Sequence, residues 1–68
     1  MFQNIEIELL KRKMTRKRLA EAIGISESAL RNKIKGRADF TFSECKKIAE
    51  LLDNLPWDYL FEQTEVGA

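Results

Sequence analysis

Apolar residues recur every three or four positions along most of the chain, and strand-like alternation of apolar and polar residues is absent. This spacing is that of α-helices with one buried face. It predicts helices over about 4–13, from Thr15 to Gly24, from Ser26 to Gly36 and over about 42–53, and a short fifth helix over WDYLF. We therefore expect an all-α fold, a compact five-helix domain over residues 1–68 with an ordered core over about 3–62 and a frayed tail over 63–68.

Residues that start and stop helices support these boundaries. Thr15 and Ser26 can cap helix N-termini through their hydroxyl oxygens, and Gly24 can end a helix in the left-handed conformation without a steric penalty. The segment TFSE at 41–44 matches a capping box. Pro56 suits the first turn of the last helix.

The stretch AEAIGISESALRNKIKG, residues 20–36, leaves only three residues between two short helices. Two helices joined so closely must cross at short distance, and the small side chain of Ala20 suits that crossing. Ile25 can then lie beneath the turn, and Leu30 can close the contact. This pattern is typical of a helix-turn-helix unit.

Charge is distributed unevenly along the chain. The net charge is +1, but residues 1–37 carry +6 and residues 38–68 carry −5. Six of the eight residues in KRKMTRKR, 11–18, are basic. The asymmetry indicates a polyanion bound on one side of the molecule, whereas a solvated helix face is the alternative explanation of such a run.

Several classes of protein are disfavoured by composition. The chain has one cysteine, Cys45, and no histidine, which argues against a disulfide framework, a metal site or a Cys–His nucleophile, so we expect no catalytic residues, no metal and no cofactor. Cys45 is expected to be a small buried hydrophobe. No apolar run approaches the length of a membrane span, and no basic segment precedes the first apolar residues, so we expect a cytoplasmic protein, and a nucleoid-associated one only if the bound polyanion is DNA.

Residues 15–36 also resemble the helix-turn-helix of the lambdoid phage repressor and Cro family. The resemblance lies in L-A-x-x-I-G-I-S (19–26), Leu30 and Gly36, and with the flanking helices and PWDYLF it extends over about residues 4–61. One position departs from the family pattern. The family usually has a bulky apolar residue where this chain has Lys33, with Ile34 beside it, a change compatible with a slight rotation at the end of the third helix.

The resemblance implies that the third helix lies in the DNA major groove and reads base edges. Its base-facing residues would be Glu27, Ser28 and Asn32, with Arg31 as a further candidate. Asn can pair with adenine, Ser can donate or accept, and Glu can accept from the cytosine amino group. Alternatively, Glu27 only favours the helix N-terminus electrostatically, and Ser28 and Asn32 are solvent-facing polar residues.

Phosphate contacts follow from the same docking. A helix N-terminus presents free N–H groups to anions, so Thr15, Arg16 and Lys17 are expected to bind the backbone of one DNA strand. Lys33, Lys35 and Arg37 are the expected phosphate contacts at the other end of the third helix.

The last helix carries a cluster of apolar side chains: Trp57, Tyr59, Leu60 and Phe61. They either seal the core or form a candidate homodimer surface, as the resemblance implies, and both roles can coexist on different faces of one helix.

The function expected from these features is sequence-specific binding of double-stranded DNA by a transcriptional regulator of the phage or bacterial repressor type, a homodimer at least on DNA. Neither an enzyme activity nor a small-molecule substrate is expected. The alternative is an antitoxin-like or adaptor module of the same fold, whose acidic second half would bind a protein partner.

Overall fold

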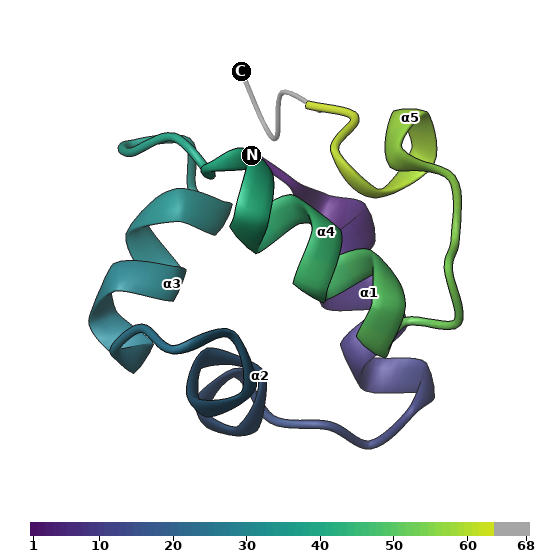
Figure 1. The fold of residues 1–68 in the computed structure, drawn as a ribbon, viewed down its shortest axis with the longest axis horizontal. Coiled ribbons are helices and arrows are strands. Elements are labelled where there is room, and N and C mark those ends of the chain that lie inside the picture. The colour runs from purple at the N-terminus through teal and green to yellow at the C-terminus, as the bar shows by residue number, and fades with distance from the viewer. Residues whose placement is uncertain (64–68) are drawn as a thin grey trace.

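Five helices and no strand occur in residues 1–63, the part of the chain that the computed structural model describes. The helices are α1 (Gln3–Lys11), α2 (Arg16–Ile23), α3 (Glu27–Ile34), α4 (Phe42–Leu51) and α5 (Trp57–Leu60) (Figure 1). The predicted all-α, five-helix fold is confirmed. The expected frayed tail lies outside the described residues, apart from Gln63.

Two helices end earlier than predicted, and backbone conformation explains both differences. α1 ends at Lys11 because Lys13 has a φ of 55°, and α4 ends at Leu51 because Asp53 and Asn54 have φ values of 62° and 54°. A residue in the left-handed region cannot continue a right-handed helix. Neither stop is marked by glycine, so the sequence pattern extended both helices too far.

The core takes at least one large side chain from every helix. The largest side chains that are fully buried are Ile5, Leu19, Leu30, Ile34, Ile48, Leu52 and Leu60. Burying one such aliphatic side chain contributes roughly 1.5–3 kcal/mol, so these residues supply much of the driving force for folding. Since Leu30 and Ile34 lie one turn apart on α3, that helix is attached to the core along a single face.

α1 and α4 occupy the middle of the molecule, α2 and α3 lie together at one side, and α5 lies at the opposite side (Figure 1). The molecule measures 32 × 24 × 23 Å. The helix-turn-helix and the last helix are therefore presented on separate parts of the surface.

A buried carboxylate joins α1 to α5. The carboxylate of Glu8 accepts hydrogen bonds from Arg12 Nη1 (2.5 Å), Tyr59 Oη (2.7 Å) and Lys11 Nζ (3.3 Å). The Arg12 bond, followed by the Tyr59 bond, lowers the pKa of Glu8 from 4.5 to about 2. Because Arg12 also bonds Asp53 at 2.8 Å, just beyond α4, this network ties together three separate segments.

Candidate nucleic-acid interface

The N-terminus of α2 is capped as predicted. Thr15 has an extended backbone, and its Oγ1 accepts a hydrogen bond from the N–H of Arg18 at 3.1 Å. By helix geometry, the N–H groups of Arg16 and Lys17 have no acceptor within the helix. A shallow depression of about 350 Å³ lies beside this end, lined by Lys13, Thr15, Lys17, Arg18 and Glu21. The combination of free N–H groups and clustered cations suits an anion.

The turn between α2 and α3 has the predicted conformation. Gly24 ends α2 with a φ of 84°, and its N–H donates to Ala20 O at 2.9 Å. Ser26 caps α3 by accepting a hydrogen bond from the N–H of Ala29 at 3.1 Å. Ala20 itself is 1% exposed, which agrees with its expected place at the helix crossing. The two caps fix the angle at which α3 leaves the turn.

α3 has one buried face and one polar face. Leu30 and Ile34 are fully buried. Ser28 and Asn32 are exposed on the opposite side of the helix, and Arg31 is exposed on its flank. Glu27 is exposed in the first turn, in line with the two buried residues. We call these four exposed residues the reading face. All four predicted base-facing residues are therefore accessible to a partner.

The segment after α3 presents two further cations. Lys35 and Arg37 are both exposed. Between them Gly36 adopts a φ of 85°, and the N–H of Arg37 donates to Asn32 O at 2.9 Å. The left-handed Gly36 turns the chain away from the axis of α3, so Lys35 and Arg37 both lie near the C-terminal end of that helix.

Lys33 differs from its expected role as a phosphate contact. Its Nζ lies 2.6 Å and 2.8 Å from the two carboxylate oxygens of Glu44 on α4, and its side chain is only 15% exposed. Ile34, not Lys33, takes the core position. The ammonium of Lys33 is therefore already neutralised inside the protein, which leaves Lys35 and Arg37 as the accessible cations near the end of α3.

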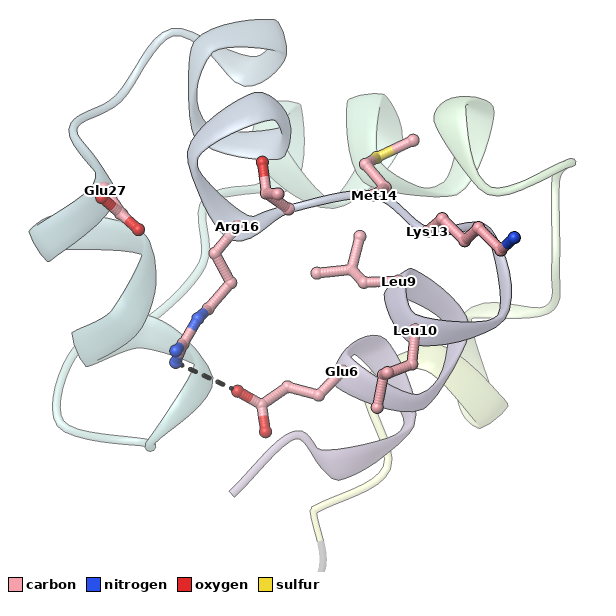
Figure 2. A pocket seen from close by; sticks show the side chains of 8 residues that line it. Glu6, Leu9, Leu10, Lys13, Met14, Arg16 and Glu27 are labelled. Carbon is pink, nitrogen blue, oxygen red and sulfur yellow. Dashed lines mark hydrogen bonds and ion pairs between the residues drawn. The ribbon is translucent and has the colours of Figure 1, made fainter.

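Arg16 has a partner that sequence analysis did not identify. Its Nη1 lies 3.3 Å from Glu6 Oε1 on α1, and the two side chains are 40% and 30% exposed. These side chains and Glu27 line a pocket of about 500 Å³. Figure 2 shows Arg16 pointing toward Glu6, with Glu27 to the left of Arg16. The remaining N–H groups of the guanidinium can still donate to a phosphate, because arginine carries five donors.

The expected dimer surface divides into inward-facing and outward-facing residues. Leu60 is fully buried, and the Tyr59 hydroxyl donates to Glu8, so both serve the interior. Trp57 is 38% exposed, and its ring centroid lies 5.3 Å from that of Phe42, which is 74% exposed. Phe61 is half-buried against Trp57. We call the exposed pair Phe42 and Trp57 the aromatic face; Phe42 had not been assigned to it from sequence.

Little in the described residues suggests another chemistry. Cys45 is half-buried rather than fully buried, and desolvation raises the pKa of its thiol. Residues 1–63 contain no cluster of three or more acidic, cysteine or histidine side chains that could hold a metal ion. Over the same residues, every helix is too short or too polar to cross a membrane.

The fold and this surface define a helix-turn-helix domain. A helix-turn-helix family model matches residues 5–60, and the chain belongs to this family, whose members have the Cro/C1-type arrangement and are DNA-binding regulators, generally not enzymes. Comparisons with curated proteins and with solved structures gave no match.

Proposed function

We propose that the protein is a sequence-specific transcriptional regulator, acting as a repressor, that inserts α3 into the major groove of double-stranded DNA. The observation that carries this proposal is the reading face. Four polar residues of α3 are exposed while Leu30 and Ile34 attach the helix to the core, and Ser28 and Asn32 lie on the side opposite these two. Such a helix can be inserted into a groove without exposing the core.

Base recognition would use the hydrogen-bonding groups of the reading face. Asn32 suits a bidentate contact with adenine, Ser28 suits either a donor or an acceptor, and Glu27 suits the amino group of cytosine. Arg31 suits guanine, whose O6 and N7 both accept. Ser26 supplies the N-cap of α3, and Glu27 follows it in the first turn.

Phosphate binding would occur on both sides of the reading face. Thr15, Arg16 and Lys17 at the start of α2 would bind one DNA strand through backbone N–H groups and side chains. Lys35 and Arg37 would bind the other. These contacts supply affinity and fix the register of the protein on DNA, but they carry no sequence information.

Two copies would bind DNA together through the aromatic face. An exposed phenylalanine beside a partly exposed tryptophan is an apolar surface that a second copy can cover, and aromatic residues are enriched at the centres of protein interfaces. The patch belongs to α4 and α5, and the reading face belongs to α3. One copy can therefore use both surfaces at the same time.

Selection from a pool of random-sequence duplexes, followed by a gel-shift titration at several salt concentrations, tests this function. We expect a recovered consensus site and a log–log salt slope of about −0.9 for each phosphate contact. An adaptor that binds a protein partner would give no consensus and little DNA affinity at physiological salt. That result would refute the proposal.

A further inference from the structure

The end of α3 is tied to α4 by a single ion pair that is largely shielded from water. Both carboxylate oxygens of Glu44 lie within 2.8 Å of Lys33 Nζ, and the two side chains are 12% and 15% exposed. The residues are 11 positions apart, and the connecting segment 35–41 contains no helix or strand. The ion pair therefore provides a direct link between two helices that the chain joins only through a loop.

Glu44 is itself held in place. It forms a capping box with Thr41, in which the N–H of Thr41 donates to Glu44 Oε1 at 2.9 Å and the N–H of Glu44 donates to Thr41 Oγ1 at 3.1 Å. Desolvation raises the pKa of Glu44, but the bonds from Lys33 and Thr41 outweigh it, so the net pKa lies below the ordinary value. Lys33 is thus bound to an ionised and oriented carboxylate.

Stability alone does not explain a lysine at this position. Desolvation of both charges offsets most of the attraction in a shielded ion pair, and an apolar residue of similar size generally stabilises a core as well or better. An ion pair differs from an apolar contact in that it depends on direction and distance. Lys33 follows Asn32 of the reading face directly, so a constraint on Lys33 also constrains Asn32.

We propose that the Lys33–Glu44 ion pair is a positioning contact that sets the orientation of α3 and thereby the accuracy with which the reading face selects its DNA site. Lys33 is then a specificity-determining residue that touches neither base nor phosphate. This inference rests on the proposed DNA-binding function.

The test compares affinities for a selected site and for an unrelated duplex. Lys33→Met keeps an unbranched side chain and removes the charge, and Lys47→Met, an exposed lysine of α4, is its control for lost positive charge. Glu44→Gln removes the acidic partner, and Glu50→Gln, at an exposed glutamate of α4, is its control. Lys33→Arg retains the cation. The double variant Lys33→Met/Glu44→Gln leaves no unpaired charge if a single variant fails to fold.

We expect Lys33→Met, Glu44→Gln and the double variant each to reduce the ratio of selected-site to unrelated-duplex affinity by about tenfold, the order of discrimination of one weakened base contact. Affinity for the unrelated duplex should stay within about twofold of the matched control, and Lys33→Arg should retain most of the discrimination.

Two results would overturn the inference. In one, all folded variants keep the wild-type ratio. In the other, Lys33→Met weakens binding to both duplexes equally and flattens the salt slope, while Glu44→Gln does not weaken binding; Lys33 would then be a phosphate contact.

If wild-type protein selects no site at all, the proposed function fails. Amide hydrogen exchange in residues 31–35 of the free protein then decides whether the ion pair restrains α3, and unchanged exchange in Lys33→Met would refute that restraint.

Discussion

Glu8 is a buried carboxylate whose ionisation is linked to the packing of α1 and α5. It is 6% exposed, and its carboxylate accepts hydrogen bonds from residues of α1 and α5. A buried carboxylate with several donors is favoured in its charged form. The same interaction with Glu8 raises the pKa of Tyr59 and that of Arg12. The hydrogen bond from Tyr59 on α5 to α1 is therefore linked to the charge of Glu8.

Acid should weaken the fold through Glu8. Its pKa is about 2 in the folded protein and 4.5 as the ordinary value, so its stabilising contribution is present above pH 4.5 and is lost as the pH falls toward 2. Glu8→Gln should lower the free energy of unfolding at pH 7 and reduce its dependence on pH between about 4.5 and 2. Urea unfolding at a series of pH values measures this. Glu50→Gln, an exposed glutamate of α4, is the control, and an equal acid loss in wild type and Glu8→Gln would contradict the account.

For individual residues, the sequence predicted hydrogen bonds between near neighbours in the chain but not those between different helices. The caps of Thr15 and Ser26 were predictable because each hydroxyl bonds an N–H three residues away. The bonds from Arg16 to Glu6 and from Lys33 to Glu44 join residues 10 and 11 positions apart on different helices. Only the packing of the helices brings those charges together, so no spacing rule could identify the pairs.

The crossing of α2 with α3 is the element-level feature on which the reading face depends. Ala20 lies at this crossing with 1% of its surface exposed, and the N–H of Ile25 donates to its carbonyl at 3.0 Å. The small side chain lets the two helices approach, and the left-handed Gly24 directs the chain into α3. The starts of α2, α3 and α4 were predicted well because side-chain caps mark them. The ends of α1 and α4 were not. Lys13 adopts a left-handed conformation that its residue type does not signal, and Asp53 and Asn54, whose residue types tolerate this conformation, were not used as a stop.

Ala20→Leu should destabilise the protein by roughly 1–3 kcal/mol, because three extra carbon atoms overpack the crossing. Ala22→Leu is the matched control, since Ala22 lies on the same helix but is exposed. The free energy of unfolding in urea measures both. Equal effects of the two substitutions would show that α2 and α3 do not pack closely at Ala20.

Basic and acidic residues, and the two candidate binding surfaces, belong to different halves of the chain. The basic first half contains the helix-turn-helix, and the acidic second half contains both residues of the aromatic face. The longest dimension, 32 Å, is close to the spacing of about 34 Å between half-sites one DNA turn apart. A pair of copies of this size can therefore contact two neighbouring half-sites. Sequence analysis assigned a candidate dimer surface to the last helix, and this stays a prediction. Which of its residues face outward could not be predicted, because that depends on how α5 packs against α4.

Selected DNA sites should be inverted repeats with half-sites about one turn apart if two copies bind through the aromatic face. Phe42→Gln should then reduce cooperative binding to the full site, because it places a polar group on the apolar contact. Binding to an isolated half-site should not change. Gel shifts that resolve one-copy and two-copy complexes measure this, and selected sites without inverted symmetry would indicate a protein that binds as a monomer.

The central claim is that α3 reads bases while the start of α2 binds phosphate, and the affinity ratio between the selected site and an unrelated duplex tests it most directly. Ser28→Ala and Asn32→Ala should each cost roughly 1–3 kcal/mol at the selected site and leave the unrelated duplex nearly unaffected. Arg16→Ala should weaken both by a similar factor and flatten the salt slope by about one unit per subunit. If Arg16→Ala alters the preference while Ser28→Ala and Asn32→Ala leave it intact, α3 does not lie in the groove.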